Sequence, residues 1–148
     1  MSGSIQISLR AGERFYVNGA VLRANRKVTL ELLNEATFLL EQHVMQAEGA
    51  TTPLRQLYFV VQTMLIDPAK AEEARSLFEK FHKLLKTSFE SAAVLAGLER
   101  VHQLVAADRA FEALKTLRVL FPIEDDILAA GQIQAHALPA QTHKAEAV

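Results

Sequence analysis

The first forty residues alternate between apolar and polar positions, which is the pattern of strands with one buried face. Ile5, Ile7 and Leu9 share one side of the first segment, and Gln6 and Ser8 lie on the other. The predicted strands are Ile5 to Leu9, Arg14 to Val17, Ala20 to Ala24, Val28 to Leu32 and Ala36 to Leu40. The predicted turns include Asn18-Gly19, Asn25-Arg26 and Asn34-Glu35. The pattern predicts a small antiparallel sheet of five strands.

The period of the apolar residues changes to three or four after residue 53, which predicts amphipathic helices. A linker is expected from Gln46 to Pro53. Thr52 is the predicted cap of the first helix, with Pro53 in its first turn, and Asp67-Pro68 repeats this start signal. Ser91 is the predicted cap of the third helix.

Asp108 is the predicted cap of the fourth helix, and Pro122 is expected to stop it. A short fifth helix is expected from Ile123 to Ala130, ended by Gly131. The predicted fold class is therefore α+β, with a small antiparallel five-stranded sheet followed by a four- to five-helix antiparallel bundle. The expected parts are a β domain at 1–46, a helical bundle at 47–131 and a mobile tail at 132–148.

A sheet of about 40 residues is too small to be stable alone, so we expect it to pack on the helices or on another subunit. The chain has no cysteine, which excludes disulfides, thiolate metal sites and a cysteine nucleophile. Its start lacks the pattern of a signal peptide, and no apolar run is long enough for a membrane span. A cytoplasmic protein without membrane contact is the simplest expectation.

Catalytic and metal-binding motifs are absent from the sequence, so we expect no enzyme, no cofactor and no metal site. His82 and His102 lie on predicted helices and are interpreted as surface or boundary residues. The acidic run from Glu124 to Asp126 is interpreted as favourable charge in the first turn of the short fifth helix. A divalent cation site is the alternative for this run.

Candidate chemistry comes from the distribution of charge. The chain has 16 basic and 17 acidic residues, so its net charge of −1 creates no strong global attraction for nucleic acid. The predicted sheet nevertheless holds five basic residues against four acidic ones, at strand ends and turns beside Tyr16. The candidate RNA-binding residues are Arg10, Arg14, Arg23, Arg26 and Lys27. Ordinary solvation of a half-buried sheet is the alternative interpretation.

The second predicted helix offers two weaker possibilities. Lys80, Lys83 and Lys86 form a basic stretch, but Glu79 stands four residues before Lys83, so a solvated helix face is the favoured interpretation. An apolar stripe on the same helix is interpreted as core rather than as a groove for a partner helix. Its members are Leu77, Phe78, Phe81, Leu84 and Leu85.

Several blocks of sequence, in the same order along the chain, resemble the flagellin post-transcriptional repressor family, FlbT. The blocks are GERFYVNGAV at 12–21, LNEA at 33–36, VMQ at 44–46, ATTPLR at 50–55, LYF at 57–59 and LFP at 120–122. The resemblance covers roughly residues 4–130. It implies a role in bacterial flagellum biogenesis, through association with the 5′ untranslated region of flagellin mRNA and promotion of its decay. Some members of the family act as positive regulators.

A second resemblance concerns the predicted sheet. Arg10-Ala11-Gly12-Glu13, followed by alternating strands, is similar to the start of the carbon storage regulator family. That resemblance implies a five-stranded dimer that reads GGA in RNA leaders. The arginine that follows the family's fifth strand is missing, because Leu40 or Glu41 stands at that position.

Two functions therefore remain open from the sequence. The first is a non-enzymatic regulator that binds the flagellin mRNA leader and forms a homodimer through its N-terminal sheet, with other flagellar regulatory proteins as further partners. The second is an adaptor or chaperone for flagellar components that does not bind RNA directly.

Overall fold

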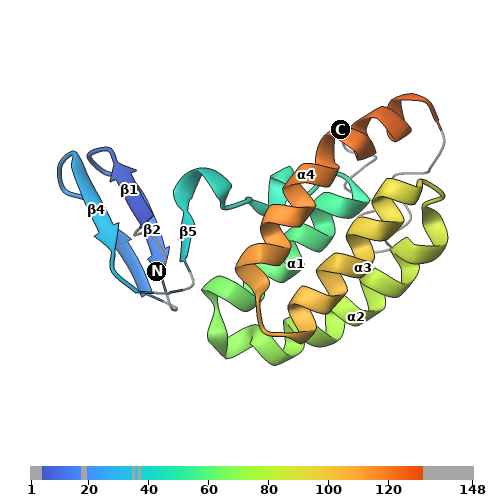
Figure 1. Cartoon of the computed structure of the whole chain (residues 1–148), viewed down its shortest axis with the longest axis horizontal. Coiled ribbons are helices and arrows are strands. Elements are labelled where there is room, and N and C mark those ends of the chain that lie inside the picture. Colours follow the sequence, from blue (N-terminus) through green and yellow to red (C-terminus); the bar gives the residue numbers. More distant parts are fainter. Residues whose placement is uncertain (1–4, 18–19, 35, 37, 132–148) are drawn as a thin grey trace.

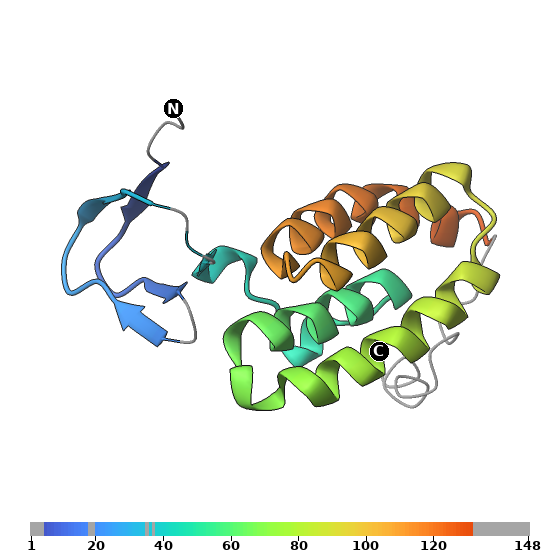
Figure 2. The ribbon, with the colours of Figure 1, turned by 60° about the horizontal axis from the view of Figure 1, so that its bottom comes forward.

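The computed structural model describes residues 5–17, 20–34, 36 and 38–131. These residues form five strands on one side of the molecule and four α-helices on the other, which confirms the predicted α+β class (Figures 1 and 2). The strands are β1 (Ile5–Leu9), β2 (Arg14–Val17), β3 (Ala20–Arg23), β4 (Val28–Leu32) and β5 (Phe38–Leu40). The helices are α1 (Pro53–Ile66), α2 (Ala71–Ser88), α3 (Ala92–Ala106) and α4 (Ala110–Ala129). Short 3-10 turns are η1 (Glu41–His43), η2 (Ala47–Gly49) and η3 (Pro68–Lys70).

The strands are all antiparallel but belong to two small sheets instead of the single sheet expected. One sheet pairs β1 with β4, and the other has the order β3-β2-β5. β5 begins at Phe38, two residues later than the sequence predicts. The predicted turn at Asn18-Gly19 lies outside the described residues, as do Glu35 of another predicted turn and the predicted tail at 132–148.

Phe111 of α4 packs on the small apolar core of the sheets. The buried members of this core are Ile7, Leu9, Phe15 and Phe38. The ring of Phe38 lies between those of Phe15 and Phe111 of α4, with centroid distances of 5.7 and 4.9 Å. Packing on the helices, one of the two routes expected for so small a sheet, is therefore used.

Local signals placed two helix starts correctly. The Thr52 hydroxyl accepts a hydrogen bond from the Arg55 amide at 3.2 Å, and Ser91 does the same for Val94 at 3.3 Å. The expected start at Asp67-Pro68 is a 3-10 turn, and α2 begins only at Ala71, without a side-chain cap.

The end of the bundle differs from the prediction, because α4 continues through Pro122 to Ala129. A proline inside a helix costs about 3 kcal/mol, but Leu120 before it and Glu124 after it are both buried, so tertiary packing holds the two halves together. Asp108 does not cap this helix. It has a φ of 63°, and Arg109 stands at the cap position without a side-chain cap.

The chain between β5 and α1 is attached to the bundle. The Tyr58 hydroxyl donates to the His43 carbonyl at 2.6 Å. The side-chain amide of Gln62 makes two hydrogen bonds to the backbone of Met45, accepting from its N–H at 2.7 Å and donating to its carbonyl at 2.8 Å. The stretch just before the predicted 46–53 linker is therefore fixed on α1. The boundary between the β domain at 1–46 and the helical bundle at 47–131 stays a prediction.

His82 lies in a different environment from the one that the sequence predicts. His82 is buried between α2 and α3, and its Nε2 donates to the Leu98 carbonyl at 2.9 Å. Its ring centroid lies 4.7 Å from that of His102, which is half-buried and contacts the Glu79 carboxylate at 3.2 Å. The surface or boundary interpretation was wrong for His82 because the residues that bury it come from another helix.

Acid is expected to destabilise the protein through His82. Burial lowers the pKa of this imidazole below its ordinary value of 6.5, and the charges of His102 and Lys86 lower it further. The hydrogen bond to the Leu98 carbonyl and the charge of Glu79 raise the pKa, but they do not outweigh burial. The unfolded chain then binds the proton more tightly than the folded chain, so the free energy of unfolding falls as the pH drops below about 6.5. Urea unfolding at pH 7.5 and 5.5 measures this fall. It should be smaller in His82→Gln, and an equal fall in both proteins would assign the titration to another group.

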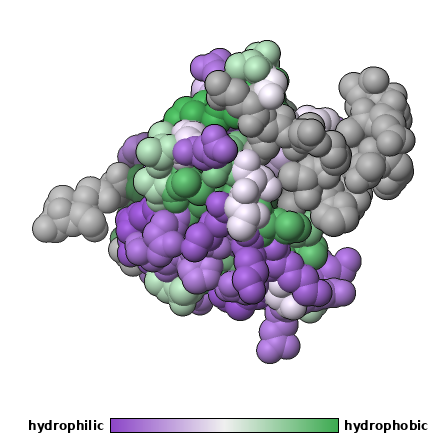
Figure 3. All heavy atoms as spheres, turned by 90° about the vertical axis from the view of Figure 1, so that its right-hand side faces the viewer, coloured by the Kyte–Doolittle hydropathy of each residue, from purple (hydrophilic) through white to green (hydrophobic). Residues whose placement is uncertain are grey.

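One end of the helical bundle carries many polar side chains. At the end of the bundle seen in Figure 3, hydrophilic side chains cover the lower part of the surface. Within the described part of the chain, no helix is both long and apolar enough to cross a membrane.

Candidate nucleic-acid interface

Two turns come together at one end of the strands. The turn between β1 and β2 and the turn between β3 and β4 are joined by hydrogen bonds from the Gly12 amide to the Ala24 carbonyl at 2.6 Å and from the Ala24 amide to the Glu13 carbonyl at 3.0 Å. Leu9 pairs with Val28 at the same end of the other sheet. Residues that are far apart in the sequence are therefore neighbours here.

The five basic residues predicted from the sequence all lie at this end, and all are exposed. Arg10 directly follows β1, Arg14 opens β2 and Arg23 closes β3. Arg26 and Lys27 belong to the turn that leads into β4. We call Arg10, Arg14, Arg23, Arg26 and Lys27 the basic end.

Two of these arginines face each other across neighbouring strands. Arg14 and Arg23 are direct partners in the register of β2 and β3, which places their Cβ atoms about 5 Å apart. Like charges in this position destabilise a sheet. Neither guanidinium forms an ion pair with a described residue. An anion bound between the two guanidiniums would relieve this repulsion and receive charge-assisted hydrogen bonds.

Two carboxylates stand among the basic residues. Glu13 accepts from the Arg10 amide at 2.8 Å and lies 3.7 Å from the Arg10 Nε. Glu41 accepts from the Arg14 amide at 2.6 Å. Glu41, one of the two residues that can stand at the arginine position of the carbon storage regulator family, therefore holds the start of β2. These two acids neutralise only part of the charge of the basic end.

The aromatic platform expected beside the arginines is not exposed. Tyr16 is half-buried and packs against the helical core, as does its strand partner Leu39. Base stacking on Tyr16, as in aromatic RNA platforms, is therefore not available at this surface. Contacts to phosphate groups are the chemistry that the basic end can provide.

Exposed apolar residues of β3 were not singled out by the sequence analysis. Val21 is 58% exposed and Leu22 is 47% exposed, although they point to opposite faces of the strand. Among the described strands, β3 pairs with β2 alone, so its other edge is free. A run of apolar residues indicates burial on both faces, and the sequence carries no signal that this strand lies at an edge.

The acidic run at 124–126 lies inside α4 and not in the first turn of a separate helix. Glu124 lies in the second half of α4 and is fully buried. Its carboxylate accepts from the Thr52 hydroxyl at 2.5 Å and from the Leu54 amide at 2.7 Å, at the start of α1. Asp125 pairs with Arg55 at 2.8 Å. Over the residues that the structure describes, no three His, Asp or Glu side chains gather as a metal site.

Burial raises the pKa of the Glu124 carboxyl above its ordinary value. Hydrogen bonds from Leu54 and Thr52 and the charge of Arg55 act in the opposite direction, because they favour the ionised form. Glu124 therefore caps a helix, as acids often do, but the helix is α1 and the acid comes from α4.

Comparison with known proteins gives a consistent family. The model of the family described as "Flagellar protein FlbT" matches residues 5–128. A protein of Rhizobium etli (strain CIAT 652) is 54% identical over 128 residues, which is 86% of each chain. A protein of Chelativorans sp. (strain BNC1) is 50% identical over 138 residues, 93% of this chain and 95% of its own. A protein of Brucella anthropi is 56% identical over 125 residues, 84% and 82% of the two chains.

All three relatives carry the name "Probable flagellum biosynthesis repressor protein FlbT". No solved structure matches the chain. The family match spans most of the described residues, and the relatives align over most of their own length. The chain therefore belongs to the FlbT family of flagellar proteins.

Proposed function

We propose that this protein is a post-transcriptional regulator of flagellin synthesis, which associates with the 5′ untranslated region of flagellin mRNA and promotes its degradation. Its relatives are named as repressors of flagellum biosynthesis, which supports a regulatory rather than an enzymatic role in the formation of the flagellum. The observation that carries the proposal is the gathering of five exposed basic residues at one end of the strands. The cytoplasm, where mRNA is translated, is the proposed location.

Phosphate contacts at the basic end make the binding depend on salt. Each phosphate that is neutralised by an arginine or lysine releases a counterion, so affinity falls as the salt concentration rises. Without an exposed aromatic platform, the sequence preference of the complex comes from the shape of the folded leader or from a partner protein.

The test is the binding of a fluorescent flagellin leader RNA to the purified full chain, measured by anisotropy between about 50 and 200 mM salt. A structured RNA of equal length and unrelated sequence is the control. We expect tighter binding of the leader and a steep fall with salt. Binding that is absent at the lowest salt would contradict the proposal.

We further propose that the protein is a homodimer formed through its N-terminal strands. Five of the large exposed apolar side chains among the described residues belong to this small part of the molecule: Ile5, Val21, Leu22, Leu30 and Leu33. The free edge of β3 can pair with the same edge of a second copy around a twofold axis. Such pairing covers Val21 and Leu22 and brings two basic ends onto one particle, which strengthens attraction for RNA.

Charge at the edge of β3 is expected to separate the dimer. Val21→Lys places a cation on each of the two paired edges, so the protein should become a monomer, whereas wild type remains a dimer at micromolar concentration. Val119 of α4 is 69% exposed, and Val119→Lys is the matched control. Light scattering coupled to size-exclusion chromatography measures the mass. A dimer in both variants would place the interface elsewhere.

An adaptor or chaperone for flagellar components is the second candidate, and an apolar surface on α2 favours it. Leu77 is 41% exposed and Leu84 is 38% exposed, one heptad apart on the helix, so the core interpretation of the stripe was wrong for these two residues. The other three members of the stripe, Phe78, Phe81 and Leu85, are buried in the core as predicted. Tight binding to a flagellar protein, with no RNA binding at low salt, would favour this function over the first.

A further inference from the structure

We propose that the RNA-binding surface continues from the basic end across η1 and onto α4, where Lys115 and Arg118 bind further phosphates of the same RNA. This inference rests on the proposed function, because its ligand is the same leader RNA. The observation that carries it is the path of the chain after β5, which places η1 between the strands and the bundle (Figures 1 and 2).

One side of η1 contacts the strand that carries Arg14. Glu41, the first residue of η1, accepts from the Arg14 amide at 2.6 Å. The register of β2 and β5 pairs Phe15 with Leu40. Glu41 therefore stands in the next position, opposite Arg14 and about 5 Å from it. Since Arg14 in turn faces Arg23 of β3, this pair of arginines begins one strand spacing from η1.

The other side of η1 is held against α4 through one tyrosine. The Tyr58 hydroxyl donates to the His43 carbonyl at 2.6 Å and accepts from Arg118 Nη1 at 2.8 Å. A single hydroxyl thus connects Arg118 to the last residue of η1. Burial lowers the pKa of the His43 imidazole below 6.5, and the charge of Arg118 lowers it further, as expected for close neighbours.

The side of α4 that faces β5 and η1 carries a second cation. Phe111, Lys115 and Arg118 are four and three residues apart, so they share one side of the helix. The Phe111 ring packs on Phe38 of β5, and Lys115 Nζ lies 5.6 Å from the centroid of the Phe111 ring. Lys115 is exposed and Arg118 is half-buried. The chain from β5 to η1 therefore runs beside a basic side of α4.

Acidic side chains do not cancel this charge. Over the part of the chain that the structure describes, Lys115 and Arg118 form no ion pair with a carboxylate. Glu112, three residues before Lys115, is already paired with Arg109, with 2.7 Å between its Oε2 and Arg109 Nη2. Glu41 lies on the path itself, but two cations stand on each side of η1.

A long polyanion suits this arrangement better than a single anion. The guanidinium of Arg118 gives one N–H to Tyr58 and keeps further donors for a phosphate. A single phosphate group contacts only one side of η1. The RNA backbone carries a phosphate at every nucleotide, so one strand that crosses η1 contacts both sides.

The test is the anisotropy assay with the leader RNA, applied to the full chain with Lys115→Gln/Arg118→Gln. Each lost phosphate contact reduces the release of counterions, so the slope of log affinity against log salt should become shallower by about two. We expect the affinity at about 50 mM salt to fall about fivefold. An unchanged slope and affinity would overturn the proposal.

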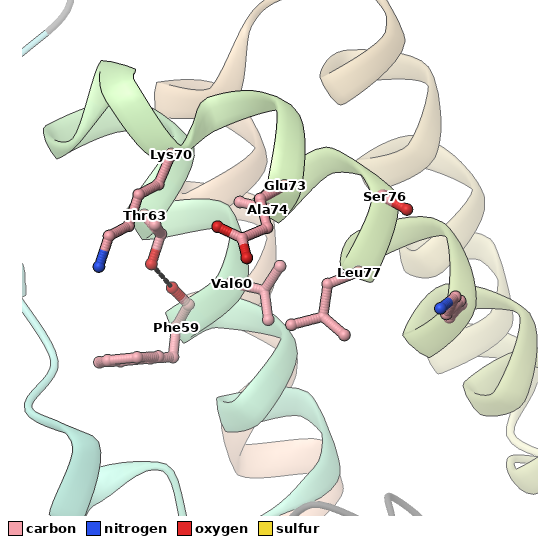
Figure 4. Close-up of a pocket in the computed structure, with 9 residues that line it drawn as sticks. Phe59, Val60, Thr63, Lys70, Glu73, Ala74, Ser76 and Leu77 are labelled. Atoms are coloured by element: carbon pink, nitrogen blue, oxygen red, sulfur yellow. Dashed lines mark hydrogen bonds between the residues drawn. The ribbon is translucent and has the colours of Figure 1, made fainter.

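Lys80→Gln/Lys83→Gln is the matched control, because these two lysines are also exposed and three residues apart on one helix. α1 and α3 each pack against both α2 and α4, so α2 lies diagonally across the bundle from α4. Lys80 lines a different surface, the groove between α1 and α2 that also contains Glu73 and Leu77 (Figure 4). The control should bind the RNA as wild type does. An equal loss in both double variants would assign the effect to overall charge and overturn the proposal.

Two single variants separate phosphate binding from the structural contact of Arg118 with Tyr58. Lys115→Gln should make the salt slope shallower by about one with an unchanged urea midpoint. Arg118→Lys keeps the charge, so its RNA affinity should stay within about twofold of wild type even where the urea midpoint falls. An unchanged slope in Lys115→Gln, or a loss of affinity in Arg118→Lys that matches the double variant, would overturn the phosphate contacts.

Failure of this inference and failure of the proposed function give different results. Wild type that binds no RNA at the lowest salt would overturn both. RNA binding that Arg14→Ala/Arg23→Ala weakens, and that Lys115→Gln/Arg118→Gln leaves unchanged, would overturn only the extension onto α4.

Discussion

Replacement of Glu124 with alanine is expected to lower the free energy of unfolding by about 3 kcal/mol. The carboxylate accepts from the Thr52 hydroxyl and from the Leu54 amide, and it lies 3.5 Å from Arg55. Without it, the first turn of α1 keeps buried donors with no acceptor, and the interior of the bundle gains a cavity. Urea unfolding followed by circular dichroism measures the change.

The neighbouring acid provides the matched control. Asp125 also pairs with Arg55, but its side chain is 53% exposed, so Asp125→Ala should cost less than about 1 kcal/mol. Glu124→Gln keeps the shape but replaces one acceptor oxygen with a donor, and we expect an intermediate loss. If Glu124→Ala and Asp125→Ala had equal effects, the cap from α4 would have no special role in stability.

The second large effect is expected on RNA affinity. Arg14→Ala/Arg23→Ala removes the pair of guanidiniums that face each other across β2 and β3. We expect affinity for the leader RNA to fall at least about tenfold at low salt, and the slope of log affinity against log salt to become shallower by about two. Because like charges repel across the strands, the double variant should be at least as stable as wild type.

A pair of lysines in the bundle provides the control for the loss of net charge alone. Lys83→Ala/Lys86→Ala removes the same net charge from exposed positions of α2. Its affinity and salt slope should stay close to those of wild type, because these lysines lie outside the basic end. Equal losses in the two double variants would mean that RNA is attracted by overall charge rather than by the basic end.

The sequence predicted the features that depend on neighbours in the chain. Alternation and helical periodicity found the strands and helices, and the caps Thr52 and Ser91 were read from local signals. Pro122 is where this reasoning failed, because a proline breaks a helix only when packing does not hold both sides. The role of Glu124 was missed for a related reason, since its partners lie about 70 residues earlier in the chain.

In the candidate site, too, the sequence predicted the residue types and their local positions but not the contacts between distant segments. The five basic residues were chosen from the sequence for their type and their place at strand ends. Their gathering depends on the pairing of β1 with β4 and of β2 with β3, which brings Arg10 and Arg14 near Arg23. The exposure of Tyr16 was overestimated because its burial comes from the helical part.

The attachment of His43 and Met45 to α1 has a consequence for partners that carry two binding motifs. Tyr58 and Gln62 leave the path from β5 to α1 little freedom to lengthen or swing. In a dimer joined at β3, the two helical bundles would then be held at a set separation. A partner with two motifs that each bind one bundle gains avidity only when its spacer spans that separation, and a longer flexible spacer lowers the effective concentration again. Spacer length thus becomes a way to measure how firmly the strands are held on the bundle.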